Sequence, residues 1–276
     1  MHRPNCETFQ SELLAGRDYE TPAAFRPSAV NRLLGRLDSW YYARLIWVVW
    51  MGYLRVLTGR YGNTCHARCS FESLRVVEEC GGRVFITGTG RLARQPGPVV
   101  FISNHMSMLE TFLLPCMLLA YSEGGMATVV KESLLRYPVF GKLLSSTDPI
   151  CVTRQNARSD LVHVLDKGVA ALRSGKSMLV FPQSTRQKEI AAGDFNSIGV
   201  KLAARAEVPV VPVAVKTDFQ EVGGLLRDFG AVHRGRPVRF EFGDPIRING
   251  NGREEHARSV QFIVDTVRLW QKQDPT

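Results

Sequence analysis

The chain has 276 residues, 45% of them hydrophobic, so it can bury one sizeable core and need not be more than one domain with extensions. Its formal net charge of +9 predicts an anionic partner, such as nucleic acid, anionic lipid headgroups or the phosphates of a thioester donor. The lysines and arginines are spread along the chain without a helix-turn-helix spacing, a zinc finger or a basic tail. We therefore expect no nucleic-acid partner.

The six cysteines show no disulfide-framework pattern, and the sequence begins without a signal peptide. Both features lead us to expect reduced thiols in a cytoplasmic setting. Cys65, His66, Cys69 and Cys80 could be assembled into a metal site, but no second close Cys or His pair supplies the spacing of structural zinc. We expect no bound metal.

The first 35 residues form a polar leader that we expect to be loop-like. It contains Pro22 and Pro27 and shows little hydrophobic periodicity. Residues 36–62 follow as an aromatic-rich segment, whose most apolar part, residues 40–57, we expect to be helical.

This helix carries only two charges, Arg44 and Arg55, with ten uncharged residues between them. Ten helical residues reach about 15 Å, roughly half of a hydrocarbon core, so a simple membrane span is not expected. Eleven steps of about 100° place both arginines on one face. The pattern indicates a peripheral or monotopic helix on the cytoplasmic face of an anionic membrane, with its aromatic residues at headgroup depth. The alternative is a helix buried against the catalytic core.

In residues 63–276, short apolar runs alternate with helical patterns. Such alternation predicts an α/β domain with a mixed, largely parallel sheet flanked by helices. The expected strands are residues 84–86, 99–102, 127–130, 150–152, 178–181, 210–215 and 238–242. The expected helices are residues 106–119, 159–173, 198–206 and a C-terminal helix near 254–271. In a sheet of this kind, ligands bind beyond the strand ends.

An imidazole and a carboxylate five positions apart, His105 and Glu110, follow the strand at residues 99–102. Such positions diverge by roughly 140° on a regular helix. The two side chains can therefore meet only if His105 lies in the turn that enters the helix, with Ser103 or Asn104 as its N-cap. The pair is suited to a general base and its orienting group, although an ordinary capped turn with a half-buried histidine would have the same sequence.

A second strand, residues 178–181, ends in a turn that carries two hydroxyls and a cation, Ser184, Thr185 and Arg186. The planar guanidinium of Arg186 is suited to a phosphate, and Thr185 could add a hydroxyl donor. The alternative role of Arg186 is a salt bridge that fixes the turn.

Four segments resemble, in order and spacing, the motifs of the glycerolphosphate and lysophospholipid acyltransferase superfamily over roughly residues 80–250. They are Asn104-His105 with Glu110, Lys131 to Leu134 with Pro138 to Gly141, Phe181 to Arg186, and Val208 to Val213. The resemblance implies a single acyltransferase domain. It also implies that the substrate-binding residues are Asn104, Lys131, Ser184, Thr185 and Arg186.

The chain departs from the family pattern at two places. Glu110 stands where the family has Asp, which keeps the charge and adds one methylene. Gln183-Ser184 stands where the family has Glu-Gly, which removes a carboxylate and a glycine beside the expected phosphate site. The second change leaves the identity of the acceptor open.

The resemblance implies transfer of a fatty acyl group from acyl-coenzyme A or acyl carrier protein to a lysophospholipid hydroxyl in phospholipid biosynthesis. The first choice of acceptor is 1-acylglycerol-3-phosphate, and no cofactor is needed beyond the acyl donor. His105 would act as general base, with Glu110 on its other ring nitrogen. The chain lacks a Gly-x-Ser-x-Gly elbow, which favours direct attack by the acceptor. Two alternatives stay open: another lyso-lipid such as a lyso-aminolipid, and a non-catalytic lipid-binding protein of the same fold.

Overall fold

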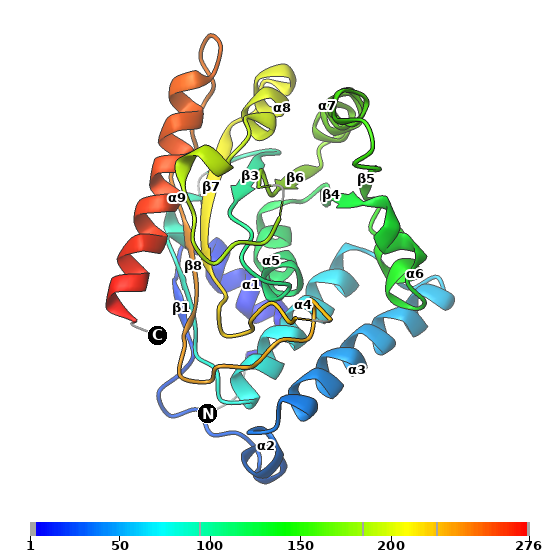
Figure 1. Ribbon diagram of the computed structural model, residues 1–276, viewed down its shortest axis with the longest axis vertical. Coiled ribbons are helices and arrows are strands. Elements are labelled where there is room, and N and C mark those ends of the chain that lie inside the picture. Colours follow the sequence, from blue (N-terminus) through cyan, green and yellow to red (C-terminus); the bar gives the residue numbers. More distant parts are fainter. Residues whose placement is uncertain (1–3, 94, 184, 225, 275–276) are drawn as a thin grey trace.

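The computed structural model describes residues 4–274 except 94, 184 and 225. In this part of the chain, a mixed eight-stranded sheet with the order β1-β2-β8-β7-β3-β6-β4-β5 lies between two layers of helices (Figure 1). The strands are β1 (Tyr19–Glu20), β2 (Val84–Thr87), β3 (Val100–Ser103), β4 (Met126–Lys131), β5 (Ile150–Val152), β6 (Ser177–Val180), β7 (Val210–Lys216) and β8 (Val238–Phe242).

The helices form the two outer layers. They are α1 (Cys6–Leu14), α2 (Ala29–Leu34), α3 (Asp38–Leu57), α4 (Asn63–Glu79), α5 (Leu109–Leu118), α6 (Phe140–Ser145), α7 (Ala157–Arg173), α8 (Ile198–Ala206) and α9 (Arg253–Gln273). Short 3₁₀ helices lie at Thr89–Arg91, Leu119–Tyr121, Glu132–Arg136 and Ala192–Asp194.

Five neighbouring strands, β7, β3, β6, β4 and β5, run parallel to one another. On the other side of β7, β8 pairs antiparallel, β2 runs parallel to β8, and β1 is antiparallel to β2. This arrangement confirms the expected mixed, largely parallel sheet flanked by helices. Because the carboxyl ends of β3, β4, β6 and β7 meet at one edge, the residues that follow these strands come together there.

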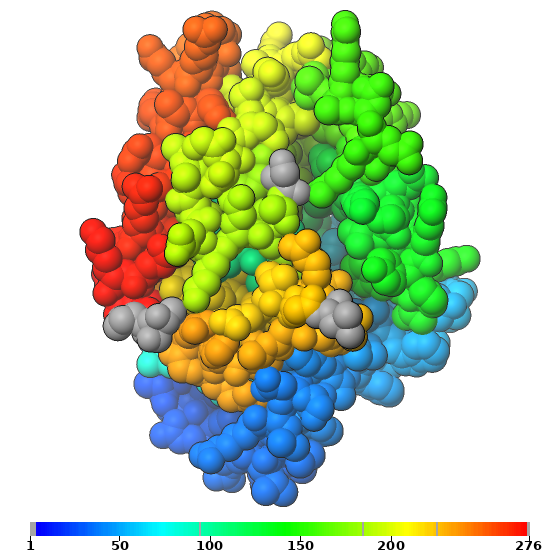
Figure 2. All heavy atoms as spheres, in the orientation of Figure 1, coloured from blue at the N-terminus to red at the C-terminus, as the bar shows by residue number. Residues whose placement is uncertain are grey.

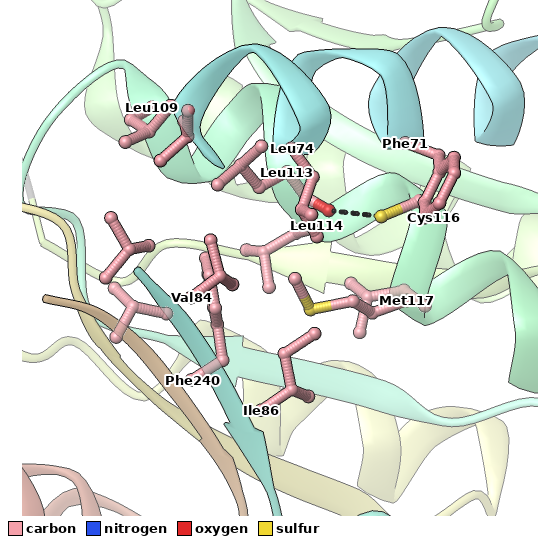
Figure 3. Close-up of a cluster of buried hydrophobic side chains, with 14 of the residues drawn as sticks. Phe71, Leu74, Val84, Ile86, Leu109, Leu113, Leu114, Cys116, Met117 and Phe240 are labelled. Carbon is pink, nitrogen blue, oxygen red and sulfur yellow. Dashed lines mark hydrogen bonds between the residues drawn. The ribbon is translucent and has the colours of Figure 1, made fainter. Parts of the chain in front are cut away.

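The sheet has a core on each face. Along β3, Phe101 points into one core, whereas Val100 and Ile102 point into the other. Successive side chains of a strand alternate between faces, so a run that is apolar throughout identifies a strand covered on both sides. Figure 3 shows part of the first core, where Leu74 of α4 packs beside Leu113 of α5.

The seven strands expected from the sequence are confirmed to within one or two residues, and so are the helices at 159–173, 198–206 and 254–271. The prediction of a loop-like leader is wrong, because the leader contains α1, β1 and α2. Cys6, Phe9 and Leu13 are buried in the first core, and Asn5 caps α1 by accepting from Thr8 N (2.8 Å). The spacing of these three apolar residues is helical, so the signal for α1 was present in the sequence.

The helix α3 packs against the core along one side, as the buried alternative requires, and leaves its other side exposed. Tyr41, Tyr42 and Leu45 are buried in the core, whereas Trp47 and Trp50 are 62% and 42% exposed. Among the described residues, no helix has the length and apolarity needed to cross a membrane. The division of the chain at residues 35 and 62 stays a prediction.

Candidate active site

His105 lies in the turn between β3 and α5, and Glu110 lies in the first turn of α5. The His105 Nδ1 and Glu110 Oε1 atoms are 2.7 Å apart, and His105 lies in the turn before the helix, as their spacing requires if the two side chains are to meet. The helix begins at Leu109 instead of residue 106, and neither Ser103 nor Asn104 caps it, so that part of the prediction is wrong. The Glu110 carboxylate instead accepts from the backbone amides of the entering turn.

The Glu110 carboxylate is fully buried and saturated with donors. Its Oε1 accepts from Met106 N (2.7 Å) and Ser107 N (2.9 Å), and its Oε2 accepts from the hydroxyls of Thr217 (2.6 Å) and Ser107 (3.0 Å). Burial alone would raise the pKa of Glu110, but the hydrogen bond and charge of His105 and the hydrogen bond from Thr217 outweigh it and lower the pKa below its usual value. The carboxylate is therefore held ionised.

An ionised carboxylate only accepts hydrogen bonds. Nδ1 of His105 therefore carries a hydrogen and donates it in the hydrogen bond to Glu110. This tautomer leaves Nε2 as the basic nitrogen. Among the described residues, none hydrogen-bonds to Nε2, and the His105 side chain is 18% exposed. The ring stacks on Phe181 at a centroid distance of 4.6 Å, which limits its rotation. The nitrogen opposite Glu110 is thus free to accept a proton.

Two buried amide side chains, which the sequence did not single out as positioning groups, fix the backbone around the histidine. Gln183 accepts from His105 N (2.6 Å) and donates to the Gln187 side chain (2.9 Å), while Gln187 N donates to His105 O (2.9 Å). Asn104 exchanges two 2.9 Å bonds with the backbone of Val215. The predicted substrate-binding role of Asn104 finds no support in this geometry, because its amide is fully buried and engaged with β7.

The turn after β6 is more open. Arg186 forms a salt bridge with Asp228 (2.5 Å), and Arg227 lies 3.4 Å from the Thr185 hydroxyl. The salt bridge expected as the alternative role of Arg186 is therefore present. Ser184 lies outside the described residues, and Lys131, at the carboxyl end of β4, is exposed.

Three partners of the site lie far from it in sequence, and residue spacing did not predict these contacts. Thr217 follows β7 and bonds to Glu110 from 107 positions away, Gln183 bonds to His105 across 78 positions, and Asp228 pairs with Arg186 across 42. Thr217 and Gln183 each had a signal, because each follows a predicted strand whose end was expected at the same edge as His105.

Cys65 and Cys69, two of the residues that could contribute to a metal site, lie in α4. In the structure, Arg55 of α3 contacts the sulfurs of Cys65 (3.8 Å) and Cys69 (3.5 Å). The described part of the chain contains no group of three or more His, Cys, Asp or Glu side chains placed to hold a metal ion.

Comparison with known proteins finds acyltransferases that are similar to this chain. A sequence profile of the family described as Acyltransferase matches residues 83–216. A 1-acyl-sn-glycerol-3-phosphate acyltransferase of Pseudomonas aeruginosa is 34% identical over 155 residues, which are 56% of this chain and 58% of that protein. A chloroplastic 1-acyl-sn-glycerol-3-phosphate acyltransferase of Brassica napus is 29% identical over 130 residues, 47% of this chain and 36% of that protein. The chain thus matches between about a third and three fifths of these relatives' lengths.

The fold is similar to that of a solved protein. The crystal structure of the 1-acyl-sn-glycerophosphate acyltransferase PlsC from Thermotoga maritima superposes with a TM-score of 0.63, covering 88% of this chain and 97% of that one at 17% identity. At this identity, the match establishes a shared fold.

Proposed function

The chain belongs to the glycerolphosphate acyltransferase superfamily, and from this premise we propose that it transfers a fatty acyl group to the free hydroxyl of 1-acylglycerol-3-phosphate. The donor is a thioester of coenzyme A or acyl carrier protein, and the product enters phospholipid biosynthesis. The names of the Pseudomonas and Brassica relatives support this acceptor.

The observation that carries the proposal is the His105–Glu110 contact of 2.7 Å at the carboxyl end of β3. An alcohol is a poor nucleophile at neutral pH and needs a base within hydrogen-bond reach, and such a base accelerates reactions about 10²- to 10⁴-fold. Glu110 holds the ring in the tautomer that keeps Nε2 basic. Burying an ionised carboxylate costs free energy unless several hydrogen-bond donors surround it, as they surround Glu110. A purely structural role would not need such an arrangement.

In the proposed reaction, Nε2 of His105 takes the proton of the acceptor hydroxyl as its oxygen attacks the thioester carbonyl carbon. Glu110 stabilises the imidazolium that forms. The tetrahedral intermediate collapses by breaking the carbon–sulfur bond, and the departing sulfur takes the proton back from Nε2. The products are an ester and a free thiol, and the enzyme returns to its starting state.

Arg186 supplies the cation for the acceptor phosphate, because a guanidinium can bind two phosphate oxygens at once. In this proposal Lys131 and Thr185 add a charge and a hydroxyl, and their exposure at the ends of the neighbouring strands β4 and β6 supports that role. The presence of Gln183 where the family has Glu does not conflict with this proposal. Its side chain is buried and bonded to His105 and Gln187, so it does not face the acceptor.

The acceptor is a lipid, so we also propose that α2 and α3 rest on the membrane surface. Exposed apolar side chains gather on these helices and the turn between them: Val30, Leu33, Leu37, Ile46, Trp47, Trp50, Leu54 and Leu57. Tryptophans favour the headgroup region, and the exposed arginines 32, 36 and 60 suit anionic lipids. Residues 29–61 contain one acid, Asp38, which pairs with Arg234 (2.8 Å).

Vesicle sedimentation tests the membrane surface. Replacing Trp47 and Trp50 with Ser should lower the fraction bound to vesicles containing phosphatidylglycerol without changing Tm, because both side chains are exposed. Leu269→Ser, on the exposed side of α9, is the matched control and should bind as the wild type does. Equal binding by all three proteins would exclude α3 as the contact.

Thiol release from acyl-coenzyme A and from acyl carrier protein, measured with a panel of lysolipids, tests the reaction itself. We expect release that depends on acceptor and is fastest with 1-acylglycerol-3-phosphate, together with a diacyl product seen by mass spectrometry. Faster turnover with a lyso-aminolipid would show that this lipid, and not 1-acylglycerol-3-phosphate, is the preferred acceptor. Lipid binding without release by either donor would show a non-catalytic protein.

A further inference from the structure

The segment between β7 and β8 meets the turn after β6 through two neighbouring pairs of residues. Asp228 bridges to Arg186 at 2.5 Å, and Arg227 reaches the Thr185 hydroxyl at 3.4 Å. Figure 2 shows the segment before β8 (orange) lying between the yellow-green residues that follow β6 and the blue residues of α2 and α3. A site with Arg186 at its centre therefore has a second wall, for which the family motifs give no role.

This wall carries one negative and one positive side chain, Asp228 and Arg227, which contact different residues of the turn after β6. Asp228 touches Arg186 through one oxygen and one guanidinium nitrogen, so most of the five N–H donors of Arg186 are not used by this pair. Arg227 is exposed, and its guanidinium lies 3.4 Å from the hydroxyl of Thr185, the residue before Arg186. The Asp228 carboxylate thus contacts Arg186, and a second cation contacts the neighbouring residue of the same turn. A phosphomonoester has the charge and the number of oxygens to bind both cations.

The backbone that carries these residues is anchored independently of their side chains. Gln220 donates to Asp228 O (3.0 Å) and accepts from the buried Tyr41 hydroxyl of α3 (2.9 Å). The Tyr42 hydroxyl donates to Gly230 O (2.7 Å). The Asp228 carboxylate can therefore leave Arg186 by rotating its side chain, which is 38% exposed, while its backbone stays in place.

We propose that Arg227 and Asp228 form the second half of the acceptor's phosphate site: Asp228 is the resident anion that the phosphate displaces from Arg186, and Arg227 is a second cation that receives it. The inference rests on the proposed function insofar as the phosphate is the acceptor's headgroup. Asp228 weakens the binding of every phosphate ligand, because its salt bridge must break first. Arg227 strengthens the same binding.

Inorganic phosphate is the probe, and its Kd is measured by calorimetry on the full chain, which needs no turnover. Asp228→Asn keeps the shape of the side chain and removes its charge. Since partly exposed ion pairs contribute up to about 1 kcal/mol, this variant should bind phosphate about 2- to 5-fold more tightly. Arg227→Ala should bind it about 2- to 5-fold more weakly.

Matched variants separate this contact from a general effect of charge. Asp148→Asn breaks a salt bridge to Lys176 (2.8 Å), and Arg268→Ala removes an exposed arginine on α9; both should leave the Kd unchanged. In an Arg186→Ala background, the gain from Asp228→Asn should disappear, because no guanidinium remains for Asp228 to occupy.

The proposal is overturned if Asp228→Asn weakens or does not alter phosphate binding, or if its gain persists without Arg186. It also fails if Arg227→Ala behaves like Arg268→Ala. With lysolipid as substrate, Asp228→Asn should lower the acceptor KM by a similar factor. If the phosphate pattern holds but no lysolipid is acylated, the phosphate site stands and the acyltransferase proposal fails.

Discussion

Glu110 and Asp228 are the two carboxylates that pair with the side chains expected to act on the acceptor, and they are held in opposite ways. Glu110 is fully buried and accepts from four residues, His105, Met106, Ser107 and Thr217. Asp228 is 38% exposed, and Arg186 is the side chain that its carboxylate contacts.

The difference indicates a division of labour between the two turns. A group that must stay charged and oriented through every turnover gains from a complete set of fixed donors, because no reorganisation is then needed during the reaction. A group that must exchange partners with a ligand gains from a single, solvent-accessible contact. We infer that the turn after β3 performs the chemistry and that the turn after β6 selects and releases the acceptor.

His105→Ala removes the base and should lower the rate of acyl transfer more than any other substitution in the turn after β3. We expect acyl transfer to fall by about 10²- to 10⁴-fold or more, with the fold retained, since Glu110 keeps its hydrogen bonds from Met106, Ser107 and Thr217. Circular dichroism checks the fold and thiol release gives the rate. Near-normal turnover in a folded variant would rule out His105 as the base.

The variants Glu110→Gln and Glu110→Asp test separately the charge and the length of the carboxylate side chain in the turn after β3. Gln keeps the shape and can turn its NH₂ toward the hydroxyls of Thr217 and Ser107, so the charge is the main loss. Asp keeps the charge but shortens the side chain, and misplacement by about 1 Å can cost on the order of 10²-fold in rate. The expected order of kcat is Glu, then Asp, then Gln. A Gln variant as active as the wild type would show that Glu110 only stabilises the turn at the start of the helix and does not assist His105.

Thr217→Val removes one donor from Glu110 and tests whether Thr217 positions the pair from β7. Hydrogen bonds to charged groups contribute about 1.5–3 kcal/mol, so the free energy of unfolding should fall by that amount. The value of kcat should also fall, by less than for Glu110→Gln, with the acceptor KM unchanged. Thr217→Ser restores the hydroxyl and should recover kcat. A loss that Ser does not rescue would assign Thr217 to packing alone.

The pH dependence of stability gives the smallest effect. The folded-state pKa of Glu110 lies below its usual value of 4.5, so its contribution is complete above about pH 4.5 and is lost as the pH falls through the folded-state pKa. The gap in unfolding free energy between the wild type and Glu110→Gln should therefore narrow below pH 4.5. A gap that stays constant with pH would mean that Glu110 titrates alike in the folded and unfolded states.

Local patterns were enough to predict the strands and the edge where the site lies, and the spacing of His105 and Glu110 allowed the contact that the family resemblance implied. These features depend on residues at most five positions apart and on alternation within one strand. The partners that complete the site are different. Thr217 reaches Glu110 only because β7 lies beside β3, and Asp228 reaches Arg186 only through the path of the segment after β7. Such contacts depend on tertiary packing, which residue spacing in one sequence does not encode visibly.

The division of labour is tested most directly by measuring kcat and the acceptor and donor KM values of Glu110→Gln and Arg186→Ala side by side. The account predicts that Glu110→Gln lowers kcat with little change in the acceptor KM. It predicts that Arg186→Ala raises the acceptor KM more than the donor KM, because a lost phosphate contact weakens acceptor binding first. If both variants changed the same parameter, or if Arg186→Ala raised the two KM values equally, the two turns would not have separate roles.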